Sequence, residues 1–397
     1  MPPSQLFVER FEGIYAKIVV LIALLLMVLP PFLLHWTWDQ TIYRAMIFLV
    51  VASPCALVSS FMPAVLSGVS NAARKGVLFK GGVHLEHIGY VTTVAFDKTG
   101  TLTEGKPKLT DIIPFHGHNE ESLLKLTASL ENLSEHPIAK TIVQSAKDKG
   151  VTLEKANALV AIPGLGINGS INGHECRIGK QGLLQGLELS SQELTIAERL
   201  ESEGKSVIFV EVDGILIGFL AIQDVLRPNT KEAVRALRDM GMKVVMLTGD
   251  RESTERAIGY QVGVDQVYAN LLPEDKVTII KKLSEKGKVA MIGDGVNDAP
   301  ALAVSSVGIA MGAAGTDVAL ETANLVLMAD DISKVPFAIS LGRRTSEVIK
   351  QNLVFAIGVI IVLVVSNFFG GINLPSGVVG HEGSTLTVIL SGLRLLR

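Results

Sequence analysis

Four long apolar runs lie in two pairs near the ends of the chain. The first pair occupies residues 18–34 and 42–65, and the second pair occupies residues 353–369 and 378–396. Each run is close to the roughly 20 residues that a helix needs to cross the hydrocarbon core of a bilayer. The pattern therefore predicts four transmembrane helices. For the fourth run, which is the most polar, a buried core helix is the alternative.

The long segment between residues 76 and 343 has a different pattern, in which short apolar runs alternate with amphipathic stretches. This alternation is typical of the strands and helices of an α/β domain. Three short runs, at residues 91–96, 244–247 and 288–292, each end in a polar turn. They are predicted to be buried strands, and open α/β sheets place their chemistry at the carboxyl ends of such strands.

The residues of these turns suit phosphoryl transfer, a reaction that needs little covalent help but much charge neutralisation. Asp97 directly follows the first strand, and a carboxylate in that position can attack a phosphoryl group. Thr248 can bind phosphoryl oxygens, and Lys276 can neutralise them. Asp294 and Asp298 can hold Mg²⁺ together with Asp97, because this ion prefers carboxylate, phosphate and water oxygens. Each turn alone is also ordinary turn or capping chemistry, but their combination favours catalysis.

The turns resemble the phosphorylation domain of P-type ATPases, in the haloacid dehalogenase-like superfamily. Asp97 matches the phosphorylated aspartate, residues 248–250 match a Thr-Gly-Asp motif, and residues 293–300 match the Gly-Asp-Gly-x-Asn-Asp hinge motif. The resemblance extends from about residue 7 to residue 397. It implies the following catalytic residues: Asp97, Lys98, Thr99, Thr248, Gly249, Asp250 and Lys276. It also implies a magnesium site made by Asp97, Thr99, Asp294 and Asp298.

The resemblance implies an α/β haloacid dehalogenase-like phosphorylation domain with an inserted α+β nucleotide-binding domain, plus four transmembrane α-helices. The expected membrane regions are residues 1–75 and 346–397, the phosphorylation domain comprises residues 76–112 and 223–345, and the insert comprises residues 113–222. The insert ends in a predicted hairpin across Asp213-Gly214. The family's ATP-binding positions fall on Glu131, His136, Pro137, Gly164 and Gly166. An ordinary helix-entry turn is the alternative for His136-Pro137.

A second candidate site lies within the apolar runs. Ser53-Pro54-Cys55 interrupts the second run, and a proline there frees backbone carbonyls, which a bilayer tolerates where the break lines a site. The fourth run carries His381, Glu382 and Thr385, and ionisable groups inside a membrane are usually functional. A position at the outer interface is the alternative for His381 and Glu382. Sulfur, imidazole, carboxylate and hydroxyl donors suit a borderline divalent transition metal.

These residues resemble a heavy-metal subgroup of the P-type ATPases, which is marked by Ser-Pro-Cys and His-Glu-Gly-Gly-Thr. The subgroup implies ATP-driven export of Co²⁺, with Zn²⁺ or Cd²⁺ in some members. Ser384 takes the place of the second glycine of that pattern, which leaves the metal open. The expected transport site comprises Ser53, Cys55, His381, Glu382 and Thr385, and the expected partners are ATP, Mg²⁺, the metal ion and membrane lipid.

Charge indicates on which side of the membrane the central segment lies. Composition and charge also argue against a nucleic-acid-binding protein and against a disulfide-stabilised one. Hydrophobic residues make up 48% of the chain against 19% charged residues, and the net charge is only −3. No basic tract suggests a nucleic-acid partner, and two cysteines imply no disulfide framework. The short loops between paired runs lack Lys and Arg, whereas basic residues border the central segment. The positive-inside rule therefore places the catalytic segment in the cytoplasm, with Arg44 as a mild exception. The plasma membrane is the expected location.

The Thr-Gly-Glu actuator motif of P-type ATPases is absent from the sequence. The chain is therefore expected to be the C-terminal portion of a transporter, impaired on its own, with a separate N-terminal half as a candidate partner. Two alternatives follow. A soluble phosphatase of the same superfamily is disfavoured by the four apolar runs. A truncated, non-transporting remnant that binds ATP and phosphorylates itself stays open.

Overall fold

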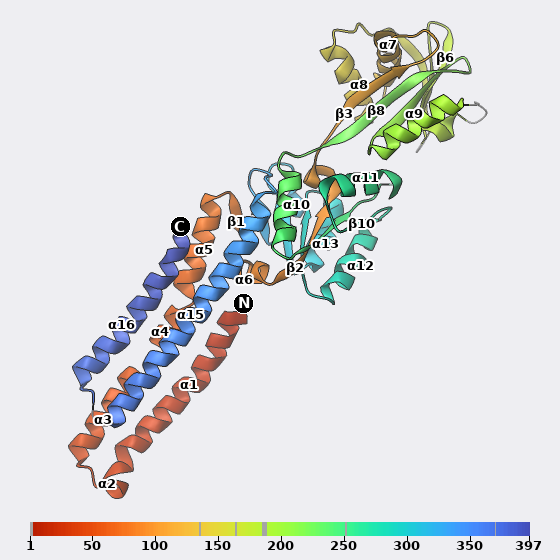
Figure 1. The fold of residues 1–397 in the computed structure, drawn as a ribbon. Coiled ribbons are helices and arrows are strands. Elements are labelled where there is room, and N and C mark those ends of the chain that lie inside the picture. The colour runs from red at the N-terminus through yellow and green to blue at the C-terminus, as the bar shows by residue number, and fades with distance from the viewer. Residues whose placement is uncertain (1–2, 135, 163–164, 185–188, 251, 370) are drawn as a thin grey trace.

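A computed structural model describes the chain except for residues 1–2, 135, 163–164, 185–188, 251 and 370. The described residues form a bundle of long helices and two β-sheets (Figure 1). One sheet lies next to the bundle, and the other lies beyond it, at the far end of the molecule from the helices. The expected nucleotide-binding residue Gly164 lies outside the described residues.

The helix bundle contains segments from both ends of the chain. Two of its helical stretches, Trp38–Arg74 and Lys334–Phe368, are long and apolar enough to cross a membrane. The first helix and the last helix pack beside them, although the last one is made more polar by His381 and Glu382. The bundle elements are α1 (Pro3–Val28), α2 (Pro30–Leu33), α3 (Trp38–Val51), α4 (Cys55–Ser59), α5 (Met62–Arg74), α15 (Lys334–Phe368), α16 (Leu374–Leu393) and η4 (Arg394–Leu396).

Polar side chains join the helices where their ends meet. At one end of the bundle, Arg44 donates from Nη1 to the carbonyl oxygens of Asn367 and Ile372, each at 3.0 Å. At the other end, Asn71 donates to the carbonyl oxygens of Leu395 and Arg397, at 2.8 and 3.0 Å. The carbonyls at a helix C-terminus lack partners within the helix. Arg44 thus satisfies a carbonyl at the end of α15, which explains a basic residue at this end of the bundle.

The sheet next to the bundle has seven strands in the order β1-β13-β12-β11-β2-β9-β10, all parallel except β1. The three strands predicted from the sequence, β2, β9 and β11, lie together near its middle. Helices cover both faces, which is why these strands are apolar along their length. The strands are β1 (Val77–Phe79), β2 (Val91–Asp97), β9 (Lys243–Leu247), β10 (Gln266–Tyr268), β11 (Lys288–Gly293), β12 (Val307–Met311) and β13 (Leu325–Leu327).

Short helices connect the strands of this parallel sheet, as such crossovers require. They are α6 (Gly82–Gly89), α10 (Thr230–Asp239), α11 (Glu252–Val262), α12 (Pro273–Ser284), α13 (Ala299–Val304) and α14 (Asp317–Thr322), with single turns at η1 (Lys98–Leu102) and η3 (Val296–Asp298). The turn η1 directly follows β2, so Asp97 is the last residue of a central strand.

The second sheet is antiparallel, with the order β3-β8-β7-β6-β5-β4. The predicted hairpin across Asp213-Gly214 is confirmed as β7 and β8. The long strands β3 and β8 pair from Thr103↔Leu226 to Pro114↔Gly218 and lead into the first sheet (Figure 1). The expected limits of the insert, 112/113 and 222/223, thus fall inside continuous strands. The elements are β3 (Thr103–Pro114), α7 (Glu120–Glu131), α8 (Pro137–Asp148), β4 (Ala156–Ile162), β5 (Gly166–Ile171), β6 (His174–Gly179), η2 (Gln181–Leu183), α9 (Ser191–Ser202), β7 (Ser206–Val212) and β8 (Ile215–Leu226).

Helix α15 joins the first sheet to the bundle without a break. Its apolar run was predicted to begin at residue 353, but the helix begins at Lys334. Val335, Ala338 and Ile339 in its first half are buried in the core of the sheet. The expected boundary between residues 345 and 346 therefore falls inside the single helix α15.

Two glycines allow α15 to pack tightly against α6. A Cβ on Gly342 would lie 2.6 Å from the carbonyl oxygen of Leu85, and one on Gly89 would lie 2.7 Å from the carbonyl carbon of Gly342. The atoms in the way belong to backbone, which cannot turn aside as a flexible side chain can. This contact therefore depends on the absence of both side chains.

We predict that Gly342→Ala destabilises the protein by about 1–3 kcal/mol, the usual cost of overpacking. Helix propensity favours alanine by only about 1 kcal/mol, so the steric cost should prevail. Thermal unfolding in detergent checks this as a lowered midpoint. Gly358→Ala is the matched control, because the space around Gly358 in the same helix is open. Equal midpoints for the two variants would contradict the close contact.

Candidate active site and membrane site

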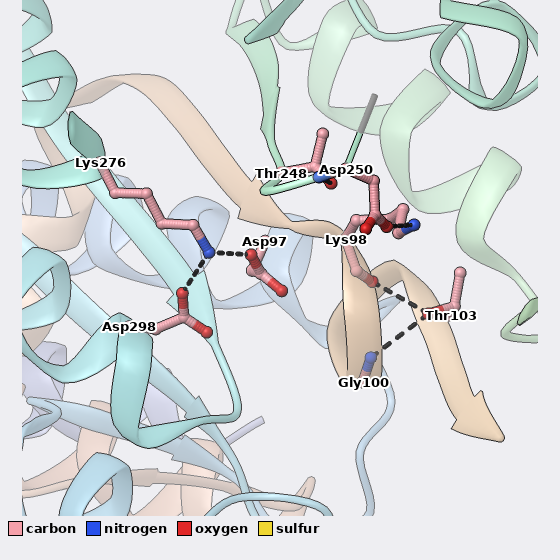
Figure 2. Close-up of polar contacts among 8 residues, drawn as sticks. All are labelled: Asp97, Lys98, Gly100, Thr103, Thr248, Asp250, Lys276 and Asp298. Carbon is pink, nitrogen blue, oxygen red and sulfur yellow. Dashed lines mark hydrogen bonds and ion pairs between the residues drawn. The ribbon is translucent and has the colours of Figure 1, made fainter. Parts of the chain in front are cut away.

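The predicted active site lies at the carboxyl ends of β2, β9 and β11 (Figure 2). Asp97 is only 6% exposed. The ammonium group of Lys276, from α12, forms an ion pair with Asp97 and a second one with Asp298 Oδ1 at 2.7 Å. Burial and the negative charge of Asp298 raise the pKa of Asp97 to about 7, while Lys276 opposes the shift. The carboxyl group of the candidate nucleophile therefore changes its protonation state near neutral pH.

The predicted magnesium ligands Asp97, Asp294 and Asp298 converge. One carboxylate oxygen from each lies within 4.8 Å of the others. Burial, followed by the charge of Asp298, raises the pKa of Asp294 to about 6. Crowded carboxylates repel one another, and a divalent cation bound between them removes that repulsion. Their oxygens are also the hard ligands that Mg²⁺ prefers. The donor set therefore fits this ion.

Gly100 makes room for this cluster. Its φ of +72° is in the left-handed region, and a Cβ there would lie 1.7 Å from Asp294 Oδ2. The turn after Asp97 therefore needs glycine both for its backbone conformation and for the approach of a carboxylate.

Of the remaining predicted catalytic residues, Thr99, Thr248, Gly249 and Asp250 line the same cavity, which has a volume of about 320 Å³, and Lys98 contacts this lining through Asp250. The Lys98 ammonium forms an ion pair with Asp250 Oδ2, and the Asp250 amide donates to Thr248 Oγ1 at 3.1 Å (Figure 2). These contacts tie the turn after β2 to the turn after β9. The cavity is lined by Asp97, Thr99, Thr248, Gly249, Asp250, Leu271, Pro273, Lys276, Asp294, Gly295, Asn297 and Asp298.

Several residues of this site were missed by the sequence analysis. Thr103 Oγ1 lies 3.1 Å from the carbonyl oxygen of Lys98, accepts from the Gly100 amide at 3.3 Å, and contacts Asp224 Oδ2. Arg227 donates to the carbonyl oxygen of Gly100 at 2.7 Å. Asp224 and Arg227 come from the end of β8, over 100 positions from the turn that they hold. Their only sequence signal was a charged pair directly after an apolar strand.

The predicted nucleotide residues lie on the second sheet and its helices. Glu131 ends α7, is buried, and has a pKa raised to about 7 by that burial. His136 is exposed and caps α8, accepting from the Ile138 amide at 3.2 Å on Nδ1, with Pro137 as the first residue of the helix. Gly166 begins β5, where a Cβ would lie 2.2 Å from the carbonyl oxygen of Ile178. The helix-entry geometry considered for His136 is thus present, and it leaves the ring at the surface.

The membrane residues lie at one level of the bundle. Pro54 separates α3 from α4, and Ser53 Oγ lies 3.0 Å from Cys55 Sγ. On α16, Gly377 lies beside Val51 and Gly392 beside Ala64. The two segments therefore run side by side in the same direction, which sets residues 381–385 level with the break.

The side chains at this level do not form a closed cage. His381 is buried, and its Nδ1 has no hydrogen-bond partner among the described residues. Thr385 Oγ1 donates to the His381 carbonyl oxygen at 3.2 Å, and Glu382 is exposed. Ser384, which replaces a glycine of the expected pattern, also donates to that carbonyl, at 2.7 Å. In the described part of the chain, ligand atoms from three or more His, Cys, Asp or Glu residues lie within 4.8 Å of one another only at Asp97, Asp294 and Asp298.

A family model for haloacid dehalogenase-like hydrolases matches residues 91–305, which is more than half of the chain. The chain belongs to this family. The matched residues comprise strands β2, β9, β10 and β11 of the first sheet and the inserted second sheet. Strands β1, β12 and β13 of the first sheet lie outside the match.

This haloacid dehalogenase-like hydrolase is also similar to metal-transporting P-type ATPases over its full length. It is 46% identical to the zinc-transporting ATPase of Bacillus subtilis (strain 168) over 398 aligned positions, covering 100% of the chain and 62% of that protein. It is 42% identical to a cadmium-transporting ATPase of Staphylococcus aureus, covering 100% of the chain and 55% of that protein. The chain thus spans less than two thirds of the length of these relatives.

Solved structures show the same similarity. A zinc-transporting PIB-type ATPase in its E2.Pi state matches with a TM-score of 0.88 and 40% identity, covering 98% of this hydrolase and 63% of that chain. A structure that describes conformational changes in the catalytic domain of the CPx-ATPase CopB-B upon nucleotide binding matches with a TM-score of 0.55 and 35% identity, covering 68% of this chain and 98% of that chain. The resemblance to heavy-metal P-type ATPases is therefore confirmed in both sequence and fold.

We predict that Asp97→Asn makes this hydrolase more stable at pH 8 when divalent ions are chelated. Because the pKa of Asp97 is about 7 when folded and near 3.8 ordinarily, the folded state holds the proton more tightly. Stability from this group is therefore present at low pH and lost as pH rises from about 4 to about 7. The Asp97→Asn variant does not lose this stability. Its free energy of unfolding should therefore exceed that of the wild type by about 1 kcal/mol or more at pH 8, and by almost nothing at pH 4.

Thermal unfolding in detergent at both pH values measures the difference. Asp239→Asn, on the exposed end of α10, is the matched control and should follow the wild type at each pH. A gain for Asp97→Asn that is larger at pH 4 than at pH 8 would contradict a raised pKa.

Proposed function

We propose that this protein uses ATP to phosphorylate Asp97 and couples the reaction to export of a divalent transition metal across a membrane. The observation that carries the proposal is the buried cluster of Asp97, Lys276, Asp294 and Asp298 at the ends of adjacent parallel strands. It combines a nucleophile, a cation for the phosphoryl oxygens and a magnesium donor set in one cavity. The helical bundle, joined to this sheet by α15, supplies the membrane part.

In the proposed reaction, an Asp97 carboxylate oxygen attacks the γ-phosphorus of ATP. The bond from that phosphorus to the β–γ bridging oxygen breaks, and ADP leaves with the electron pair. Lys276 neutralises charge on the transferred group, and Thr248 offers a hydroxyl to its oxygens. Asp97, Thr99, Asp294 and Asp298 would hold Mg²⁺, which would supply further charge neutralisation. Lys98 and Asp250 keep the turns after β2 and β9 together.

The nucleotide is proposed to bind on the second sheet, with its phosphates reaching Asp97. The buried acid Glu131 and the exposed ring of His136 are the candidate contacts for adenine, with Pro137 fixing the start of α8. Gly164 and Gly166 would let the backbone approach the ligand. Because β3 and β8 lead from this sheet to the turn after Asp97, the two binding regions share a connection.

The transported ion is proposed to bind at the break in the second membrane helix, through Ser53, Cys55, His381, Glu382 and Thr385. A thiolate, an imidazole and oxygen donors suit borderline ions such as Co²⁺, Zn²⁺ and Cd²⁺. The Ser-Pro-Cys pattern favours Co²⁺, whereas two relatives are named for zinc and cadmium. ATP hydrolysis measured against a panel of the three ions distinguishes these choices.

Basic residues support a cytoplasmic position for both sheets. They lie at the end of the bundle nearest the first sheet, on α5 and on the first half of α15, as the positive-inside rule requires. We propose the plasma membrane of a cell as the location. A separate chain carrying an actuator domain is a further candidate partner, and adding one to the ATPase assay tests it.

The second candidate function is ATP binding and autophosphorylation without transport. The open arrangement at the membrane site favours it, since Glu382 is exposed and the donors do not converge. Metal uptake into vesicles that contain the protein distinguishes the two functions. Uptake that requires ATP supports export, whereas phosphorylation without uptake supports the second function.

We predict that γ-labelled ATP transfers its label to Asp97 in the presence of Mg²⁺. The label should be stable in acid and released by hydroxylamine, as an acyl phosphate is, and it should vanish in Asp97→Asn. Asp239→Asn serves as the control and should retain the label. Label that persists in Asp97→Asn would refute the assignment of the nucleophile.

We predict that Cys55→Ala and His381→Ala each weaken binding of the transported metal by about 10-fold or more, equivalent to about 1.4 kcal/mol. Each change removes one donor that the other ligands cannot replace. Metal binding is measured by titration of detergent-purified protein. Cys176→Ala and His118→Ala are the matched controls, because both residues lie in the second sheet or its loops. Unchanged affinity in both test variants would rule out this site.

A further inference from the structure

Asp330 holds a loop beside the active site. It lies after β13 with a left-handed φ of +54°, and its side chain is 11% exposed. Its Oδ1 accepts from the Ala313 amide at 2.8 Å, and its Oδ2 accepts from the Ala314 amide at 2.9 Å. Both carboxylate oxygens are therefore used to fix the backbone of the loop that follows β12.

Arg227 connects this loop to the turn that follows Asp97. Its Nη2 lies 3.7 Å from Asp330 Oδ2 and donates to the Gly100 carbonyl oxygen at 2.7 Å. Its Nε donates to the Thr101 carbonyl oxygen at 3.1 Å. One half-buried ion pair thus joins two loops that are far apart in the sequence.

Both loops contact Asp294, from opposite parts of the chain. The Asp294 carboxylate lies against Gly100, where a Cβ would be 1.7 Å from Oδ2. The Asp294 carbonyl oxygen accepts from the Thr316 amide at 2.8 Å, two residues beyond the amides that Asp330 holds. The side chain of Asp294 therefore lies against one of the two loops that the ion pair joins, and its backbone is hydrogen-bonded to the other.

We propose that Arg227 and Asp330 are positioning residues that fix Asp294 for binding a divalent cation, and so set the affinity of the site for Mg²⁺. This inference rests on the proposed magnesium site and extends it to residues that do not touch the ion. A divalent site with few protein ligands is sensitive to the placement of each carboxylate, because Mg²⁺ requires near-ideal geometry.

The residue types fit this role. A guanidinium group offers several N–H donors in a rigid plane, so Arg227 can serve two carbonyls and a carboxylate together, which a lysine cannot do with the same geometry. An aspartate offers two acceptor oxygens, whereas asparagine would turn an N–H₂ group toward one of the two amides. Replacing Arg227 by lysine and replacing Asp330 by asparagine should therefore weaken the interaction of Arg227 with Asp330 to different extents.

The test measures binding of Mn²⁺, as a paramagnetic substitute for Mg²⁺, to the purified full chain without nucleotide. The variants are Arg227→Lys, Arg227→Gln, Asp330→Asn and the double variant Arg227→Gln/Asp330→Asn. We expect Mn²⁺ affinity to fall about 10-fold in Arg227→Gln and Asp330→Asn, and less in Arg227→Lys. Because both residues act through one ion pair, the double variant should be about as weak as the weaker single variant.

Arg235→Gln is the matched control, since Arg235 lies on α10, its side chain is 85% exposed, and it forms an ion pair with Asp239 on the same helix. It should bind Mn²⁺ like the wild type. The Mg²⁺ concentration that gives half-maximal phosphorylation should rise in parallel with the loss of Mn²⁺ affinity. Maximal phosphorylation at saturating Mg²⁺ should largely recover, which a general loss of structure would not allow.

Unchanged Mn²⁺ affinity in Arg227→Gln and Asp330→Asn would overturn the inference, as would the absence of saturable Mn²⁺ binding in the wild type. Reduced maximal phosphorylation with an unchanged Mg²⁺ midpoint would also overturn it, by showing only a structural role. If no variant, including the wild type, forms an aspartyl phosphate while Mn²⁺ affinity changes as expected, the proposed function fails and the positioning role stands.

Discussion

The contact of Lys276 with two carboxylates is the interaction on which the active site depends. Asp97, Asp294 and Asp298 bring three acidic groups within 4.8 Å in a mostly buried cavity, an arrangement that repels itself. Although burial lowers the pKa of Lys276, the charges of Asp97 and Asp298 raise it above its ordinary value. The ammonium group therefore stays charged and offsets part of the repulsion. Burial, followed by the charge of Asp298, keeps the pKa of Asp97 at about 7, because Lys276 offsets these two effects only in part.

The same site shows how distant parts of the chain are held together. Helix α12 supplies Lys276, and β8 ends at the pair Asp224 and Arg227, which holds the turn after Asp97. The strands β3 and β8 also belong to the second sheet, so Thr103 and Arg227 lie at the connection between the two sheets. On the opposite side, α15 extends from the core of the first sheet into the bundle, and its contact with α6 through Gly89 and Gly342 is rigid.

Much of this arrangement could be predicted from the sequence because it follows local patterns. The strands before Asp97, Thr248 and Asp294 are apolar runs that end in polar turns, and parallel strands bring those turns to one edge. The start of α15 could not be predicted from hydropathy. Its first half is amphipathic, since one side packs on the sheet, so only the apolar second half gave a membrane signal.

The roles of Arg227 and Asp330 could not be predicted for a different reason. Their partners are backbone carbonyls and amides, which carry no sequence signature, and the two residues are joined only through the fold.

Lys276 also sets a condition on the proposed reaction. In the described structure its ammonium group already contacts Asp97, the proposed site of phosphorylation, and Asp298, which would help to hold the divalent ion. A cation bound among the three carboxylates would take over part of this neutralisation, because it competes for the same oxygens. Lys276 would then be released toward the incoming phosphate, where Thr248 lines the other side of the cavity. In the proposed reaction, cation binding and phosphate binding would therefore be coupled through this one side chain.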